Sequence, residues 1–387
     1  MPPSTSSTLF ASILCVACLA TLVYARALHK IEGVPNFGSD IGIGGSNDEV
    51  PWPGIQWLEK LSNIDEYSFT LHGRTYNSAY EAMLHPFSNS STNPVKNFNA
   101  YVNSFIIPHY IAKYVVQKYG IFWSHHIITY LRNLIAGTFV YFGTGAFFHY
   151  HCYIHPRSKE IFKNRKRPEW SIMVNQMKLA QASLFIYVLL PGFSEFLIEE
   201  GFTKSVYTFD ELGGFRMYLM YTVLYFALVE IGIYWMHRTL HTNKTLYKYI
   251  HLLHHSYSAP HTLTPWCSIA FHPLDGILQA SPYVVLLPFV PTHYLTHIGM
   301  VFLTAVWATY IHDAMDWNVD PIMGSKYHTV HHTHYIYNYG QIFTFCDRIW
   351  GTLRIPMTKT GVQGERVQLK VVDGWFGKGR GGKAKSS

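Results

Sequence analysis

Long apolar stretches follow one another through the middle of the chain, separated by polar sequence. Three of them have about 20 residues, the length of a helix that crosses the hydrocarbon core of a bilayer: Leu131 to Tyr150, Leu179 to Ile198, and Met217 to Met236. A fourth stretch, Gly276 to Ile311, is longer and contains several prolines. The pattern predicts an all-α protein that crosses the membrane several times.

Histidines cluster in the polar sequence that follows the third and fourth apolar stretches. They fall into three groups: His237 and His241; His251, His254 and His255; and His328, His331 and His332. Residues three or four positions apart lie on one face of a helix, so each group would present its imidazoles in one direction. Eight imidazoles exceed the usual load of about four or five ligands for one ion, and the spacing therefore predicts a site for two metal ions.

The proline-containing stretch must return the last histidine group to the side of the first two. A single crossing between Gly276 and Ile311 would leave His328 on the opposite side of the membrane from His255, so an even number of crossings is required. Two short helices that turn between Pro288 and Thr292 would provide it. We therefore expect about four spans, with a short hairpin among or beside them, and a helical cap that holds the histidines.

The composition also indicates a membrane protein and suggests its orientation. Apolar residues make up 49% of the chain and charged residues only 14%, against about 25% charged in soluble proteins. The net charge of +7 is not gathered in a basic soluble domain, which argues against nucleic-acid binding. Positive charges are dense between His155 and Arg167, and the positive-inside rule places this loop in the cytosol. The histidine groups and the C-terminus then face the cytosol as well.

The two ends of the chain differ from its middle. Residues 1–27 hold a short apolar run and an A-x-A-like site, so we expect a signal peptide or a signal anchor. Residues 28–125 are rich in turn-forming residues and are expected to form a loosely ordered luminal extension, with a glycosylation sequon at Asn89. Residues 357–387 are expected to form a basic cytosolic tail. Its Lys383 and Lys385 resemble a dilysine retrieval signal of the endoplasmic reticulum, with a solvated tail as the alternative.

An all-histidine site for two metals at a membrane surface favours oxidation of a lipid. Hydrolytic zinc sites typically have three protein ligands and a water, and soluble di-iron proteins use mostly carboxylates. Neutral imidazoles leave the full positive charge on the metals, which favours a state that can attack an unactivated C–H bond. The alternative from another class is a histidine-rich metal transporter, but its ligands are expected on broken helices at mid-membrane.

The histidine boxes HRTLH, HLLHH and HTVHH resemble those of the fatty acid hydroxylase and sterol desaturase superfamily. The segments VEIGIYWMHRTLH, HPLDGILQ and HTVHHTHYIYNYGQ are similar to the delta-7-sterol 5(6)-desaturases within it. This resemblance implies a catalytic domain over residues 222–356, with residues 126–221 forming membrane spans and the basic loop. A C4-methyl sterol oxidase or a fatty acyl hydroxylase on the same scaffold is the nearest alternative.

The resemblance also implies the reaction, the cofactors and the partners. It implies removal of two hydrogens from C5 and C6 of a delta-7 sterol, by an oxidoreductase that uses O2 and two iron ions in the membrane of the endoplasmic reticulum. Electrons would come from NAD(P)H through cytochrome b5 and its reductase. Arg165 and Lys166, in the basic loop, are candidates for docking acidic cytochrome b5, with a merely solvated loop as the alternative.

Further candidate residues lie outside the boxes. The resemblance implies that His312, in IHDAMD, is a ligand and that His272, in FHPLDG, is a ligand or supports one. Asp316 stands where some relatives carry a second histidine, and we expect it to support a ligand. By contrast, His125 and His126 lack box spacing and are expected to lie at the membrane interface.

In addition to Asp316, four carboxylates are candidates to hold ligand histidines in place. Asp275, Asp313 and Asp347 are expected to accept the second ring N–H of a ligand, which would fix its tautomer. Glu230 lies inside the third apolar stretch, where a carboxylate is costly. We therefore expect Glu230 to support a ligand or to have a structural partner.

Overall fold

The computed structural model describes residues 68–71, 74–84, 93–259, 261–317, 319–357 and 369–374. The expectations for residues 1–27, for Asn89 and for the lysines at the C-terminus fall outside this part of the chain. The described residues are mainly helical, and the sheets among them have two short strands each. This confirms the prediction of an all-α polytopic membrane protein.

The chain divides into two compact units. The first comprises the described residues up to Arg132 together with Glu195–Tyr218 and Pro291–Gly299. The second comprises Asn133–Ser194, Leu219–Val290 and the described residues from Met300 onward. All the histidines of the boxes belong to the second unit.

The first unit begins with an antiparallel hairpin that packs on helices. Its elements are β1 (Phe69–Leu71), β2 (Arg74–Tyr76), α3 (Ala79–Leu84), α4 (Pro94–Ile106), the first part of α5 (His109–His149), and β3 (Ser205–Val206), which pairs in parallel with β4 (Thr292–His293). Asn93 caps α4 by accepting hydrogen bonds from the N–H groups of Val95 and Lys96. Gly120 interrupts α5 at a φ of 76°, which favours glycine. Buried aromatic and aliphatic side chains, among them Tyr80 and Ile128, form the core of this unit. The expectation of loose order was therefore wrong for the described residues between 68 and 125, because their apolar side chains pack together despite the many turn-forming residues.

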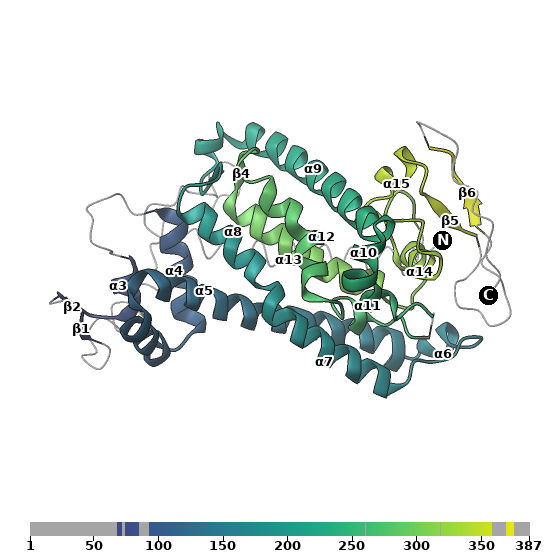
Figure 1. Ribbon diagram of the computed structural model, residues 1–387, viewed down its shortest axis with the longest axis horizontal. Coiled ribbons are helices and arrows are strands. Elements are labelled where there is room, and N and C mark those ends of the chain that lie inside the picture. Colours follow the sequence, from purple (N-terminus) through teal and green to yellow (C-terminus); the bar gives the residue numbers. More distant parts are fainter. Residues whose placement is uncertain are drawn as a thin grey trace, which may run out of the picture. The chain divides into compact units, whose positions relative to one another are not determined.

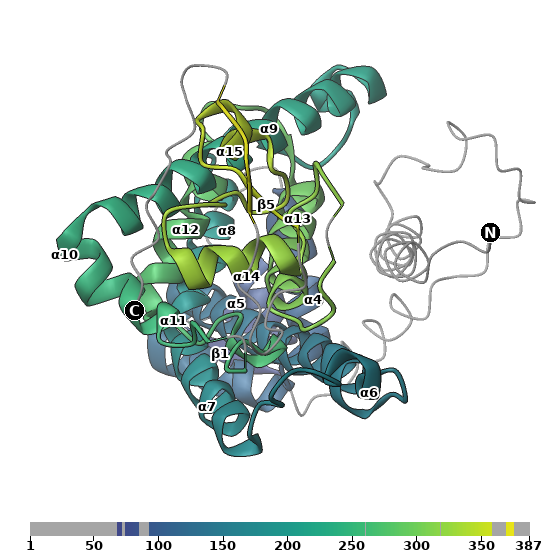
Figure 2. The same ribbon diagram turned by 90° about the vertical axis from the view of Figure 1, so that its right-hand side faces the viewer.

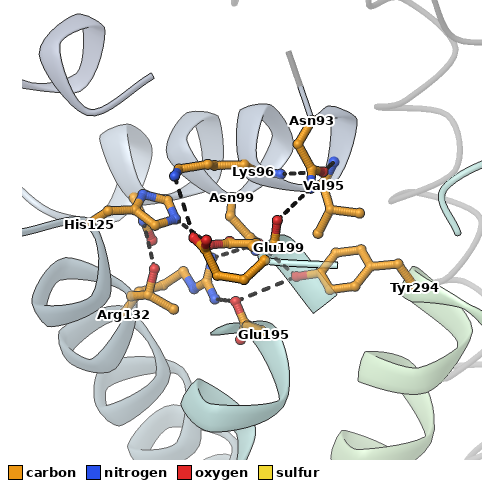
Figure 3. A network of polar contacts seen from close by, with 12 residues as sticks. Asn93, Val95, Lys96, Asn99, His125, Arg132, Glu195, Glu199 and Tyr294 are labelled. Carbon is orange, nitrogen blue, oxygen red and sulfur yellow. Dashed lines mark hydrogen bonds and ion pairs between the residues drawn. The ribbon is translucent and has the colours of Figure 1, made fainter. Parts of the chain in front are cut away.

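A buried network of polar side chains joins segments of the first unit (Figure 3). The amide of Asn99 donates to Glu199 Oε1 (2.6 Å) and accepts from Arg132 (3.0 Å) and from the hydroxyl of Tyr294 (2.6 Å). Arg132 also pairs with Glu195. His125 lies 2.8 Å from Glu199 and is only 1% exposed. His125 is therefore a buried member of this network, and the expectation of an interfacial residue was wrong because its acidic partner was not visible in the local sequence.

The second unit is a set of long helices followed by shorter ones (Figure 1). Its elements are the rest of α5, α6 (Ser158–Ile161), α7 (Trp170–Tyr187), the first part of α8 (Leu189–Glu199), α9 (Phe215–Thr242) from Leu219 onward, α10 (Lys244–Leu246), α11 (Leu252–His255), α12 (Pro273–Val285), α13 (Tyr294–Ile311) from Met300 onward, α14 (Ser325–His334), α15 (Phe345–Ile349), β5 (Arg354–Pro356) and β6 (Leu369–Val371). α9 and α12 pack closely, because a Cβ at Gly232 would lie 2.7 Å from Pro282.

Three helical segments among the described residues are long and apolar enough to cross a membrane: Trp170–Glu199, Phe215–Thr242 and Tyr294–Ile311. They include the second and third predicted spans and the returning arm of the predicted hairpin. The first predicted span lies almost wholly in α5 but is not among the three, and it contains the polar residues Arg132 and Asn133. α12 has 13 residues, fewer than a full span needs. The chain turns between Val285 and Tyr294, as predicted.

Candidate metal centre

Four short segments bring histidines to one place in the second unit. His237 and His241 lie in the last turns of α9, and His254 and His255 end α11. His312 follows the last residue of α13. α11 and α14 lie side by side in both views (Figures 1 and 2), and the rings of His255 and His332 are 4.5 Å apart. The chain returns through α12 and α13 and so brings the separated boxes together. This agrees with the prediction that an even number of crossings lies between them.

The histidines form two separate groups, each suited to one metal ion. The first contains His237, His241, His251, His255 and His331, and the second contains His254, His312, His328 and His332. Within each group, one nitrogen of every ring lies within 4.8 Å of the others. Nine of the ten predicted ligands are thus brought together, and they divide five to four.

Each HxxHH box contributes to both groups. His251 and His255 belong to the first group, whereas His254 belongs to the second. In α14 the arrangement is reversed, because His328 and His332 belong to the second group and His331 to the first. Residues four apart share a helix face, whereas the residue just before the last histidine points about 100° away from it. In the folded protein, two imidazoles of each box thus belong to one group and the third imidazole belongs to the other.

Distances between ring nitrogens fit ligation of metal ions. His251 Nε2 lies 2.8 Å from His241 Nε2 and 3.1 Å from His255 Nε2. In the second group, His328 Nε2 lies 2.9 Å from His312 Nε2 and 3.1 Å from His332 Nε2. Two imidazole nitrogens bound at right angles to one ion, each at about 2.1 Å, lie about 3 Å apart. The side-chain chemistry and the spacing thus suit a metal-dependent oxidase.

Four of the histidines are held with Nε2 directed at the centre. In each of them Nδ1–H donates to a fixed oxygen: His251 to Asp275 Oδ2 (2.7 Å), His237 to the Tyr339 carbonyl (3.0 Å), His331 to the Tyr337 carbonyl (2.8 Å), and His312 to the Ala308 carbonyl (2.6 Å). These bonds fix the tautomer and leave the lone pair on Nε2. Among the described residues, the buried Nε2 atoms of His237 and His331 have no hydrogen-bond partner, as expected of nitrogens that bind metal.

Burial favours the neutral form of four of the grouped imidazoles, those of His254, His312, His331 and His332. Desolvation lowers the pKa of His331 to about 3 and that of His312 to about 4. The pKa values of His254 and His332 are also well below the ordinary value, first because of burial and then because other histidines lie close by. Neutral imidazole is the form that binds a metal ion, so these four side chains are ready to bind one at neutral pH.

Among the predicted supporting carboxylates, Asp275 bonds directly to a histidine of the two groups, His251. Asp347 instead accepts the N–H groups of Tyr339 and Gly340, both at 2.8 Å. Glu230 accepts the N–H groups of Ile342 and Phe343, both at 3.1 Å. These two carboxylates therefore hold the loop of residues 337–343, whose carbonyl groups orient His237 and His331. Asp347 and Glu230 thus act on the histidines indirectly, by fixing the backbone whose carbonyl groups accept from the rings.

Expectations for four single residues are corrected. Asp313 accepts the N–H of Met315 (2.8 Å) rather than that of a histidine ring. Asp316 forms an ion pair with Arg165, at a position whose φ is 57°. The same ion pair leaves Arg165 only 12% exposed, so it is a poor docking charge. His272 lies outside both histidine groups, because it caps α12 by accepting from Leu274 N–H through Nδ1.

Sequence reasoning missed the three carbonyl acceptors, at Ala308, Tyr337 and Tyr339. A backbone carbonyl is present at every position, so residue type carries no signal for it. The one available signal was the similarity of the segment HTVHHTHYIYNYGQ, which includes two of the three, to known desaturases.

A cavity adjoins the histidines within the second unit. It opens outward, and its empty space is about 660 Å³ when the part open to solvent is included. Apolar side chains such as Ile233, Ala308 and Ile311 line it, together with His237 of the first histidine group and His312 of the second. An apolar molecule in this cavity would lie against both groups.

The comparisons with known proteins agree with this arrangement. The fatty acid hydroxylase family profile matches residues 222–352. The chain is 43% identical over 233 residues to a Delta(7)-sterol-C5(6)-desaturase of Nicotiana tabacum, a match that covers 60% of this chain and 85% of the relative. It is 36% identical over 235 residues to a lathosterol oxidase of Rattus norvegicus, covering 57% of this chain and 73% of the relative. No solved structure matches the chain. With its histidines gathered beside an apolar cavity, the chain belongs to the family of fatty acid hydroxylases and sterol desaturases.

Proposed function

We propose that the protein introduces the C5–C6 double bond into delta-7 sterols, with two iron ions held by the nine grouped histidines. The names of the relatives from Nicotiana tabacum and Rattus norvegicus support this reaction. The observation that carries the proposal is the position of the cavity, which His237 lines from one histidine group and His254, His312 and His328 from the other. A sterol in this cavity would have its C–H bonds next to both metal sites.

The proposed reaction balances with O2 as the oxidant. The sterol loses two hydrogen atoms, and NAD(P)H provides two further electrons, which with two protons complete the reduction of O2 to two molecules of water. When bound, the irons supply the oxidising power needed for an unactivated C–H bond.

The protein's own residues orient the histidines, surround the substrate and exclude water from it. Asp275 keeps the Nδ1 proton on His251, and the Tyr339 carbonyl does the same for His237. Apolar side chains of the cavity surround the substrate and keep bulk water from the reacting carbons. The neutral imidazoles leave the charge of the metals undiminished.

Complementation tests the proposed function most directly. The chain is expressed in a strain that lacks sterol 5-desaturase, and its sterols are profiled. We expect delta-7 sterols to fall and 5,7-diene sterols to appear. A strain that keeps its delta-7 sterols while 4-methyl sterols or 2-hydroxy acyl chains change would instead support one of the alternatives on the same scaffold. Uptake of metal without any lipid oxidation would support a transporter.

We further propose that the centre faces the cytosol at the membrane of the endoplasmic reticulum and receives electrons from cytochrome b5. The basic loop between the first two predicted spans supports this, because Lys159 and Lys163 are exposed there. Positive side chains on an exposed loop attract an acidic partner and raise its association rate.

Charge reversal in this loop is expected to weaken the interaction with cytochrome b5. With Lys159→Glu and Lys163→Glu combined, KM for cytochrome b5 should rise about tenfold at low salt, because two attractive charges become repulsive. Arg216→Glu is the matched control, since Arg216 is exposed at the first turn of α9, the end remote in sequence from His237. Steady-state kinetics with purified cytochrome b5 check this. An equal rise in KM for the control would argue against docking at the loop.

A further inference from the structure

The cavity must accommodate one polar group of its substrate, if the proposed function holds. A sterol is apolar except for its 3-hydroxyl group, and a hydroxyl that loses water without gaining a hydrogen bond weakens binding. Only a few covalent bonds separate the oxygen on C3 from C5 and C6. The partner of the 3-hydroxyl therefore has to lie in the part of the protein that adjoins the histidines.

Most polar side chains of the cavity already have partners within the protein. Ser268 accepts from Thr309 (3.3 Å), and Thr304 donates to the Met300 carbonyl (2.9 Å). Gln279 Nε2 donates to Asp275 (2.7 Å). Apart from the histidines, the other polar side chains that line the cavity are those of Tyr187 and Gln341. Neither makes a hydrogen bond through its side chain to any residue that the structure describes.

The backbone around Gln341 is fixed on three sides. The N–H of Gly340 donates to Asp347 and the N–H of Ile342 donates to Glu230, while the Gln341 carbonyl accepts from Trp307 Nε1 (3.0 Å). Asp347 is fully buried and Glu230 is 7% exposed. The Gln341 carbonyl and the N–H groups of both neighbouring residues are thus occupied, which fixes the backbone from which the side-chain amide of Gln341 extends. Tyr187, at the end of α7, has no comparable clamp.

The same loop holds a metal-site histidine. Tyr339, two residues before Gln341, accepts the Nδ1–H of His237 through its carbonyl. His237 and Gln341 both line the cavity. A group bound by Gln341 would thus keep a fixed position relative to the first histidine group, because one rigid segment determines both.

We propose that the side-chain amide of Gln341 binds the 3-hydroxyl group of the sterol and thereby places C5 and C6 at the metal centre. The amide Nε2–H donates to the hydroxyl oxygen, and the hydroxyl donates to Oε1. This makes Gln341 a positioning residue, and the buried carboxylates Glu230 and Asp347 maintain its place. The proposal rests on the proposed function, because it assumes a sterol in the cavity.

Equilibrium binding to the metal-loaded full-length protein tests this without turnover. Under anaerobic conditions and without an electron donor, the Kd is measured for a radiolabelled delta-7 sterol and for its 3-deoxy analogue. The wild type should bind the 3-hydroxy sterol about tenfold more tightly than the 3-deoxy analogue, because one neutral hydrogen bond contributes about that factor to affinity. Gln341→Leu should reduce this ratio to about one while the Kd of the 3-deoxy analogue and the metal content stay unchanged. Gln341→Asn keeps the amide on a side chain that is one methylene group shorter, so the ratio of the two Kd values should be intermediate.

Two control variants, together with sterol binding and turnover by the wild type, distinguish failure of the anchor from failure of the proposed function. Thr304→Val and Tyr187→Phe each remove a hydroxyl from the cavity and should keep the tenfold ratio. If Gln341→Leu and Gln341→Asn keep the ratio, or if Tyr187→Phe removes it, Gln341 is not the anchor, although the proposed function stands. If wild type binds neither sterol and forms no 5,7-diene, both the anchor and the proposed function are wrong.

Discussion

Replacing His251 with alanine is expected to abolish formation of 5,7-diene sterols and to empty the first histidine group of metal. His251 is fully buried, and its Nε2 lies within 3.1 Å of the corresponding atoms of His241 and His255. Its removal deletes the central ligand and also leaves the Asp275 carboxylate without its imidazole partner. We expect at least a 100-fold loss of activity, since even the loss of an outer partner costs about 10–100-fold. Iron content and sterol profiles measure the two effects.

His272→Ala is the matched control for this substitution. His272 is also a histidine of the second unit, but it caps α12 and lies outside both histidine groups. The variant should retain full iron content and activity and lose about 1 kcal/mol of stability, the usual effect of removing an N-cap. Loss of iron from the His272 variant comparable with that of the His251 variant would show that His272 is a ligand after all.

Replacing Asp275 with alanine is expected to lower metal affinity about 10–100-fold. Without the carboxylate, the Nδ1–H of His251 has no acceptor, and the ring is free to adopt the tautomer whose Nε2 carries the proton. Gln279 also loses the acceptor for its amide. Titration of the iron-depleted protein with Fe²⁺ under anaerobic conditions measures the change.

Two further variants separate orientation from charge. Asp275→Asn keeps one acceptor oxygen for His251, but its amide nitrogen then faces the donor of Gln279, so we expect an intermediate affinity. Asp313→Asn should leave the affinity unchanged, since Asp313 bonds to Met315 N–H and not to a histidine. If Asp275→Asn binds iron as weakly as Asp275→Ala, the negative charge matters more than the hydrogen bond to His251.

The sequence predicted which histidines gather but not how they divide between two metals. HxxHH spacing puts three rings on roughly one side of a helix, and this is a local property. The assignment of His254 and His255 to different groups depends on where α14 and the end of α13 meet α11. Such packing depends on residues far apart in the chain, so local spacing does not reveal it.

The hairpin was predicted correctly because it followed from a requirement on the whole chain. If the boxes share one centre, the segment that links them must return to the same side, and α12 and α13 do so. The supporting carboxylates were predicted less well. Asp347 and Glu230 are buried and paired, as their positions suggested, but their partners are backbone N–H groups of one loop. Nothing in the residue types distinguishes that arrangement from a direct bond to a ring.

The exchange of ligands between the boxes has a consequence for changes in chain length. One added or deleted residue between His328 and His331 would rotate the later rings by about 100° relative to the earlier one. His331 would then turn away from the first ion and His332 from the second, so both sites would be damaged at once. The length of a box is therefore constrained more tightly than the identity of the residues between its histidines.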